Sequence, residues 1–154
     1  MAGPQQPELE MGYADDRFFT VTLPWPPSQN QSLKARVSKV TGKPLFYDDK
    51  GVKNWRAEAT KILAEVSGLH SVFMDEPVEV HLSLYPPSNR SDTDGVEKKV
   101  LDVLQGVAYH NDRQVYGRRS ERTIETHGTD AKIVVRVWLF GTPWPLGYDL
   151  SPNR

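Results

Sequence analysis

The chain has 154 residues, of which 38% are hydrophobic and 25% are charged, and its formal net charge is −1. These values are typical of one globular domain with a real core, and the absence of cysteine excludes disulfides, thiolate metal sites and cysteine nucleophiles. The longest apolar runs, such as residues 133–140, are too short to cross a membrane.

The two ends of the chain differ in composition from its middle. Residues 1–16 are polar, acidic and contain proline and glycine, so we expect a disordered N-terminal extension. Residues 17–140 form the expected domain, and residues 141–154 form a tail without periodicity. The N-terminus lacks the basic start and apolar stretch of a secretory signal, which predicts a cytoplasmic protein.

Basic side chains concentrate in two stretches despite the near-zero net charge. Residues 34–56 carry seven lysines and arginines against Asp48 and Asp49, and residues 113–122 carry four arginines against Glu121. Such stretches can track phosphates. A solvated surface is the equally good alternative for either stretch taken alone.

In the first half of the chain, a strand and a helix enclose a long basic loop. The β-branched and aromatic residues 18–23 predict a strand, which the following PWPP ends. Residues 28–46 are expected to form a loop, or a β-hairpin around Thr41 and Gly42. Apolar residues at helical spacing then predict a helix that begins at Asp48 or Asp49 and ends near Val66.

In the second half, strands alternate with one more helix. Residues 78–85 alternate between apolar and polar side chains, which predicts a half-buried strand. A helix is expected from Gly95 to about Val107, followed by strands over about 114–125 and 131–140. The whole pattern predicts an α+β fold, a small mixed sheet of about four strands packed with two helices.

Two aspartates precede the second helix. Asp94 stands three residues before Glu97, the spacing of a capping box, so Asp94 is the expected N-cap. Asp92 lies two residues earlier, and in extended backbone its carboxylate points to the same side. Two carboxylates held close repel each other unless a cation lies between them. The pair therefore predicts either an acidic cap or a site for a divalent ion such as Mg²⁺.

The helix that follows has a polar face near these aspartates. At about 100° per residue, Lys98 and Asp102 share the open face with Asp94. Lys98 can form an i, i+4 ion pair with Asp94 or stabilise charge on a scissile phosphate. Lys99 is expected to be a surface residue, and the apolar Leu101 is a candidate dimer contact.

A third carboxylate, Asp112, is expected in a loop before the next strand. With Asp92 and Asp94 it could hold one or two metal ions. His110 is a candidate base or ligand, although a lone histidine in a loop is more often a surface residue. The arginines that follow suit phosphate recognition.

Three motifs occur in order along the chain: LPWPPSQN at 23–30, DTDGVEKKVLDVLQG at 92–106 and NDRQV at 111–115. Together they resemble the RusA family of Holliday junction resolvases, which are Mg²⁺-dependent homodimeric endonucleases. The resemblance extends over about residues 18–140.

The resemblance implies roles for individual residues. Asp92, Asp94 and Asp112 match the family's catalytic, metal-binding aspartates, and Lys98 matches its essential lysine. Asp102 matches a further acidic position. Asn30 and the proline-rich start would shape the DNA-facing surface, with a simple strand-ending turn as the alternative for Trp25 and Pro26. The residues expected to contact DNA are Asn30, Lys34, Arg36, Arg113, Arg118 and Arg119.

The sequence departs from the family pattern at two positions. Gly95 stands where asparagine is common, and Asn111 replaces the first of two paired aspartates. Neither change removes a residue assigned to the metal, so activity is still expected.

The resulting hypothesis is an endodeoxyribonuclease that resolves four-way DNA junctions by paired nicking, in recombination and repair. Its expected cofactor is Mg²⁺, with Mn²⁺ as a substitute, and its expected partners are branched DNA and a second copy of the chain, with no membrane. A homodimer would place two active sites on opposed strands of the junction. The expected location is the cytoplasm of a bacterial or phage-infected cell. The alternatives are a nuclease for flaps or forks and an inactive junction-binding protein.

Overall fold

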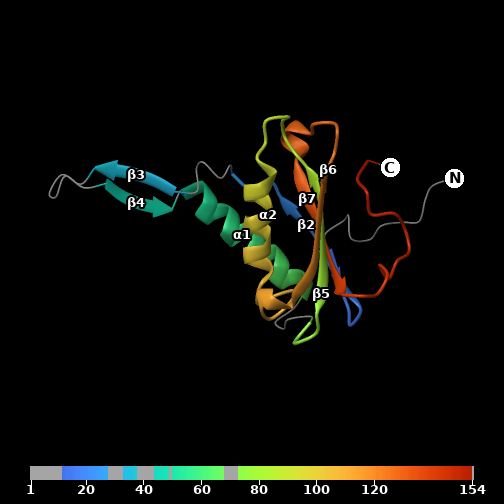
Figure 1. Cartoon of the computed structure of the whole chain (residues 1–154). Coiled ribbons are helices and arrows are strands. Elements are labelled where there is room, and N and C mark those ends of the chain that lie inside the picture. The colour runs from blue at the N-terminus through green and yellow to red at the C-terminus, as the bar shows by residue number, and fades with distance from the viewer. Residues whose placement is uncertain (1–11, 28–32, 38–43, 49, 68–72, 154) are drawn as a thin grey trace.

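The computed structural model describes residues 12–27, 33–37, 44–48, 50–67 and 73–153 (Figure 1). Its centre is a five-stranded sheet in the order β1-β2-β7-β5-β6. Strand β7 pairs antiparallel with both β2 and β5, whereas β6 pairs parallel with β5. The strands are β1 Gly12–Ala14, β2 Phe18–Pro24, β5 Val78–Tyr85, β6 Val115–Arg122 and β7 Lys132–Leu139.

Both long helices lie on one face of this sheet, α1 at Lys50–Ser67 and α2 at Thr93–Leu104 (Figure 1). The predicted α+β class is therefore confirmed. The inward side chains of β5 are Val78, Val80, Leu82 and Leu84, and all of them are buried. Each buried aliphatic side chain of this size contributes about 1.5–3 kcal/mol to the free energy of folding. The core between the sheet and the helices therefore stabilises the position of α2 on the sheet.

The second face of the sheet is covered as well. The C-terminal segment runs over it (Figure 1), and Trp144 packs there with Phe18 and Trp138. His81 and Ser83, on the expected solvent side of β5, are consequently buried. The prediction of a half-buried strand at 78–85 is wrong in this respect, because the C-terminal segment, for which no packing was predicted, covers the second face of the sheet.

A short strand extends the sheet at its N-terminal edge. Residues 12–14, expected within a disordered extension, form β1 and pair antiparallel with β2. Gly12 allows a close approach, since a Cβ there would meet Val66 at 2.5 Å. Residues 1–11 lie outside the described part of the chain.

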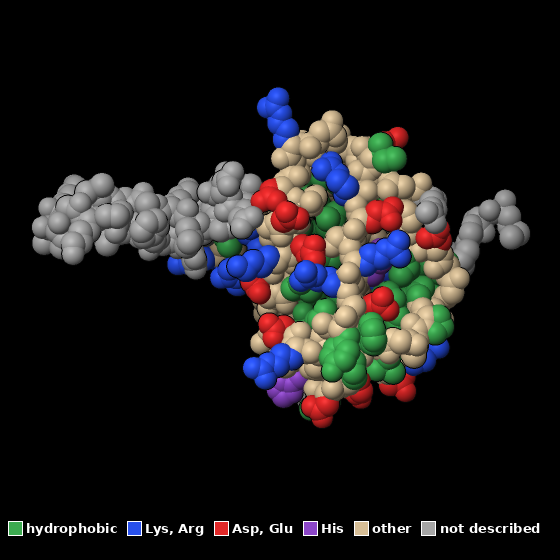
Figure 2. Space-filling view, in the orientation of Figure 1, with side chains coloured by type: hydrophobic (Ala, Val, Ile, Leu, Met, Phe, Trp, Pro, Cys, Tyr) green, Lys and Arg blue, Asp and Glu red, His purple; other side chains and the backbone are tan. Residues whose placement is uncertain are grey.

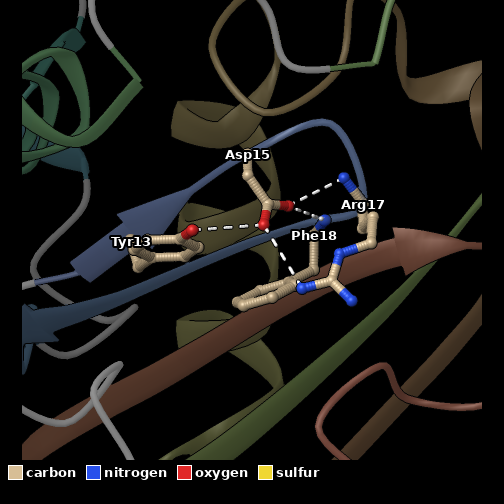
Figure 3. A network of polar contacts seen from close by, with 4 residues as sticks. All are labelled: Tyr13, Asp15, Arg17 and Phe18. Carbon is tan, nitrogen blue, oxygen red and sulfur yellow. Dashed lines mark hydrogen bonds and ion pairs between the residues drawn. The ribbon is translucent and has the colours of Figure 1, made fainter.

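Asp15 closes the turn between β1 and β2 (Figure 3). Its carboxylate accepts hydrogen bonds from the backbone N–H groups of Arg17 and Phe18, at 2.8 and 3.0 Å, and from the hydroxyl of Tyr13 at 3.2 Å. Burial acts to raise the pKa of Asp15, but these hydrogen bonds and the Arg17 charge outweigh it and lower the pKa. This network explains why the chain is ordered before the predicted start of the domain.

The remaining predicted elements are confirmed with small shifts at their ends. The basic loop contains an antiparallel hairpin of β3, Leu33–Val37, and β4, Pro44–Asp48. Its predicted turn at Thr41 and Gly42 lies outside the described residues. Figure 1 shows the hairpin projecting away from the sheet beyond the start of α1. Within the described ranges, no helix is long and apolar enough to span a bilayer.

Candidate active site

Helix α2 begins at an aspartate, but not at the predicted one. Asp92 is the N-cap: its carboxylate accepts hydrogen bonds from the backbone N–H groups of Asp94 and Gly95, at 3.1 and 3.3 Å. The helix accordingly starts at Thr93 and not at Gly95, and Asp94 lies within its first turn. The prediction that Asp94 is the cap is wrong, because either carboxylate of the DTD sequence fits that role and Asp92 is placed to reach the two amides.

An open pocket of about 780 Å³ runs along the exposed face of α2. Asp94, Lys98 and Asp102 line it from the helix, which confirms that they share one face. Figure 2 shows acidic and basic side chains side by side over α2 and β6. The remaining lining residues are Glu97, Leu101, Gln105, Tyr109, Asp112, Val115, Tyr116 and Arg118.

Lys98 is exposed at this pocket. In the described part of the chain, Lys98 does not form the i, i+4 ion pair with Asp94 that the sequence allowed as its purely structural role. Leu101, the candidate dimer contact, is half-buried and packs against the core while it also lines the pocket. Lys98 is therefore the cation on α2 that is available to a phosphate in the pocket.

Asp112 reaches the same pocket from the opposite end of α2. Because β5 and β6 are parallel, the segment after the end of β5 and the segment before the start of β6 lie at opposite ends of the sheet. Asp92 belongs to the first segment and Asp112 to the second. Along α2, Asp94 and Asp102 are separated by about 12 Å, and Asp102 is near the Asp112 end.

The electrostatics of Tyr109 connect Asp102 and Asp112 at this second end of α2. Burial, and then the negative charges of Asp112 and Asp102, raise the pKa of the buried Tyr109 hydroxyl. That hydroxyl donates a hydrogen bond to the carbonyl of Leu101 at 3.2 Å. Asp102, which matched only a further acidic position of the family pattern, thus acts on the same ring as Asp112.

The structure brings Asp94, Lys98 and Asp112 into one pocket but does not draw the three aspartates into one compact cluster. Asp92 is not among the pocket's lining residues. In the ranges that the structure describes, no three histidine, aspartate or glutamate side chains are grouped as a metal site. The three-carboxylate metal site therefore stays a prediction.

Gln114 positions the loop that carries Asp112, a role that was not predicted from the sequence. Its side-chain oxygen accepts hydrogen bonds from the backbone N–H groups of His110 and Asn111, both at 2.8 Å. Its amide nitrogen donates to the carbonyls of Phe73 and Glu76, at 3.3 and 3.0 Å. His110 itself is exposed, so its role here is through its backbone.

Asn111, one of the two departures from the family pattern, has a structural role. Its side-chain oxygen accepts a hydrogen bond at 2.9 Å from the N–H of Arg113 and caps the short helix η3, Asp112–Gln114. With Gln114 it forms a capping box. The oxygen that asparagine retains is sufficient for this cap.

A bulge in β6 places an aromatic residue at the pocket. The register shifts so that Val78 pairs with Val115 while Glu79 pairs with Gly117. Tyr116, between these two β6 positions, is exposed and lines the pocket, and its ring lies 5.7 Å from that of Phe140. Bulges re-aim side chains in this way near functional sites, and nothing in the sequence pattern indicated this one.

The arginines predicted to contact DNA do not share one surface. Arg118 forms a 2.7 Å ion pair with Glu97 at the pocket, whereas Arg119 lines a second cavity on the other face of the sheet. Successive residues of a strand point to opposite faces, which explains the separation. Arg113 is exposed on η3. Asn30 and the side chains of Lys34 and Arg36 lie outside what the structure describes.

Lys99 corrects a further prediction, since it is 9% exposed and not a surface residue. Burial lowers the pKa of its ammonium group, Asp92 acts to raise it, and the Arg56 and Lys98 charges act to lower it. Lys99 thus lies near the cap of α2 together with a basic residue from α1. Its place at the flank of the apolar stripe allows its hydrocarbon stem to be covered.

The proline-rich start has a packing role. The indole N–H of Trp55 in α1 donates a hydrogen bond to the carbonyl of Pro24 at 2.8 Å. Trp25 is half-buried against the core and Pro26 is buried. These contacts support the strand-ending interpretation for Trp25 and Pro26.

Comparison with protein-family models identifies a family for most of the chain. The family model described as endodeoxyribonuclease RusA matches residues 24–137. A comparison with curated proteins finds no match. The matched range is well over half of the chain and includes α2, Lys98 and Asp112, so the chain belongs to the RusA family of endodeoxyribonucleases.

Proposed function

We propose that the protein is a Mg²⁺-dependent endodeoxyribonuclease that resolves four-way DNA junctions by paired nicking. The observation that carries this proposal is the pocket along α2, where Asp94, Lys98 and Asp112 come together from two regions of a chain of the RusA family. Phosphodiester hydrolysis needs groups that neutralise the phosphate and activate water, and this pocket supplies candidates for both.

The donor set fits a hard divalent ion. Among the residues that the structure describes, the pocket is lined by carboxylates and by no histidine, and the chain has no cysteine. Mg²⁺ is typically bound by one or two carboxylates while it keeps waters and substrate oxygens, so a compact set of three is not required. We propose that these carboxylates hold one or two ions, with Asp92 and Asp94 at the start of α2 and Asp112 at its other end, and Mn²⁺ would suit the same oxygens. When bound, such an ion makes water more acidic and neutralises charge on the phosphate.

The chain's own residues have separate tasks in this proposal. Lys98 places its ammonium beside the scissile phosphate and stabilises the charge that grows there. Asp92 also fixes the start of α2 through its two backbone hydrogen bonds, and so orients Asp94. Gln114 and Asn111 position Asp112 by holding η3. Arg118 can contact DNA once its ion pair with Glu97 breaks. This ion pair is partly exposed and so stabilises the fold only slightly.

The assembly and location are further parts of the same proposal. A four-way junction has approximate two-fold symmetry, so a homodimer would bring two equivalent sites to opposed strands. The proposed junction substrate supports a role in recombination and repair, and the proposed location is the cytoplasm of a bacterial or phage-infected cell. Light scattering should give a mass twice the 17.4 kDa of one chain. A monomer at working concentrations that still makes paired nicks would contradict the dimer.

The test is cleavage of a mobile four-way junction in Mg²⁺ by the wild type, Asp92→Asn and the control Asp130→Asn. Asparagine caps helices about as well as aspartate, so Asp92→Asn removes the charge and keeps the cap. Asp130 is exposed outside the pocket. We expect paired nicks from the wild type and the control, and binding without nicking from Asp92→Asn.

Other results would redirect the proposal. Cleavage of flaps or forks in preference to four-way junctions would favour the broader branched-DNA nuclease. Equal junction binding with no cleavage by any of the three proteins would contradict catalysis and leave a binding protein.

A further inference from the structure

The pocket along α2 contains an exposed aromatic ring that the proposed chemistry does not use. Tyr116 lines this pocket together with Lys98 and Asp112, and it is 66% exposed. The ring of Phe140, 47% exposed, lies 5.7 Å from it. Figure 2 shows hydrophobic side chains at the surface near the start of β6, with acidic and basic side chains around them. An exposed apolar patch with a charged rim is typical of an interaction site.

The fold holds the ring of Tyr116 in place. Tyr116 is the extra residue of the bulge in β6, and Val115 before it packs against the core. A Cβ at Gly117 would lie 3.2 Å from the Phe140 ring, so glycine there allows Phe140 to pack against the strand beside Tyr116. The backbone N–H of Phe140 donates a hydrogen bond to the carbonyl of Pro77 at 3.0 Å. The ring is therefore positioned before any partner arrives, which lowers the entropic cost of binding.

The fold positions the ring of Tyr116 and leaves its hydroxyl without a partner among the described residues. By contrast, the hydroxyls of Tyr13 and Tyr109 donate hydrogen bonds to Asp15 and to the carbonyl of Leu101. The flat apolar surface of Tyr116 is thus the group that the pocket offers to a partner.

The charged side chains around the ring indicate what that partner is. Glu97, Lys98, Asp112 and Arg118 line the same pocket. The core of a protein–protein interface is depleted of charged residues, so these surroundings disfavour a second copy of the chain as the partner. A DNA strand fits them better, because its phosphates suit the cations and its bases have flat faces that stack on aromatic rings.

We infer that Tyr116 stacks on a nucleobase next to the branch point of the DNA. The inference rests on the proposed function for the substrate, and it adds the means by which branched DNA is selected. In a continuous duplex both faces of each base pair are covered by neighbours, whereas a base pair at an open branch has one free face. Every base has such a face, so the ring selects DNA structure and not sequence.

The first experiment measures fluorescence anisotropy of an immobile four-way junction, and of a linear duplex with the sequence of its arms, as the full chain is added without metal. Tyr116→Leu removes the ring and keeps an apolar side chain, so it should weaken junction binding about tenfold and duplex binding less than about twofold. Tyr116→Phe should bind both DNAs as the wild type does. Tyr13→Leu makes the same change in β1, at the opposite edge of the sheet, and should leave both affinities unchanged.

The second experiment detects the stacked base directly. The fluorescent base 2-aminopurine, whose emission is quenched by stacking, is placed in turn at each position beside the branch and at one position in the middle of an arm. At one or more branch positions, emission from the complex should be at least about twofold higher with Tyr116→Leu than with the wild type or Tyr116→Phe. Emission from the middle of the arm should be the same with all three proteins.

Several results would overturn the inference. Unchanged junction affinity in Tyr116→Leu, or an equal loss for the junction and the duplex, would show that the ring does not select branched DNA. Equal emission from every branch position in all three proteins would show that no base stacks on it. Tyr116→Leu should have the same mass as the wild type by light scattering, and a lower mass would place the ring between two copies of the chain instead.

Failure of this inference differs from failure of the proposed function. Asp112→Asn should keep the preference for junctions over duplexes while it loses junction cleavage. A wild type that cleaves junctions, with a Tyr116→Leu variant that binds them equally well, overturns the stacking role alone. A wild type that prefers junctions through Tyr116 and cleaves no DNA contradicts the nuclease proposal and supports the stacking role.

Discussion

The two faces of the sheet are built from different kinds of sequence. On the helix face, regularly spaced aliphatic residues of β5 such as Val80 and Leu82 are covered by α1 and α2, and polar groups gather on the outer side of α2. On the second face, His81 and Ser83 are buried under an irregular C-terminal segment anchored by Trp144. On the helix face, the candidate catalytic groups thus lie outside an apolar core, whereas on the second face polar side chains are buried.

Removing the anchor of the second face should have the largest effect. Trp144→Ala should lower the free energy of unfolding by about 3–5 kcal/mol, because it leaves a cavity beside Phe18 and Trp138. Urea denaturation measures this, with the exposed Phe140→Ala as a control expected to cost less than about 1 kcal/mol. A loss below 1 kcal/mol for Trp144→Ala would mean that the segment does not stabilise the sheet.

On the helix face, the most sensitive position should be Gln114. Gln114→Ala leaves two backbone N–H groups and two carbonyls without this partner, so we expect a loss of about 2–3 kcal/mol. Because Gln114 positions Asp112, kcat should also fall more than about tenfold at a temperature where the variant is folded, with little change in KM.

Gln114→Glu provides the matched comparison. Glutamate keeps the oxygen that accepts from His110 and Asn111 and loses the donor to Phe73 and Glu76. It should therefore recover part of kcat. If the folded Gln114→Ala protein has the kcat of the wild type, Gln114 serves stability alone.

Acid should act on the second face through His81. Burial, then the charges of Arg136 and Arg119, lower its pKa from 6.5 to about 4 despite the opposing Glu121 and Asp149. The unfolded chain therefore takes up this proton at higher pH than the folded chain does. The contribution of a neutral His81 is complete above about pH 6.5 and is lost as the pH falls toward 4.

Urea midpoints at several pH values between 7 and 4 measure this contribution. In the variant His81→Gln, the urea midpoint should decline less steeply with falling pH than in the wild type, because only the titration of His81 is removed and the carboxylates titrate equally in both proteins. Identical slopes would indicate that His81 is as accessible to protons in the folded state as in the unfolded state.

The smallest expected effect concerns the ion pair at the helix-side pocket. Glu97→Gln should change stability by less than about 1 kcal/mol, because Arg118 is largely exposed. With Arg118 released, junction affinity should increase and the slope of log K against log salt should steepen by about one phosphate contact. A salt slope equal to that of the wild type would place Arg118 outside the DNA interface.

Regular patterns were enough to predict the helix face, and irregular contacts account for what was missed. Alternation and helical spacing gave α1, α2, the four longer strands and the shared face of Asp94, Lys98 and Asp102. Asp92 and Asp94 were equivalent as caps by sequence, and only the fold decides between them. Gln114 stands in the NDRQV motif, but it acts through Phe73 and Glu76, some forty residues away in sequence, so its role could not be predicted. The Trp144 cover has no periodicity and left no local signal.

The central claim is that carboxylates at opposite ends of α2 act as one site. Its most direct test is a double-mutant cycle on single-turnover junction cleavage with Asp94→Asn, Asp112→Asn and the double variant. Groups that act as a unit are strongly non-additive. Each single variant should lose about 100-fold or more in rate, and the double variant should be about as slow as the slower single one. Multiplied losses in the double variant would contradict the claim and indicate two independent contributions.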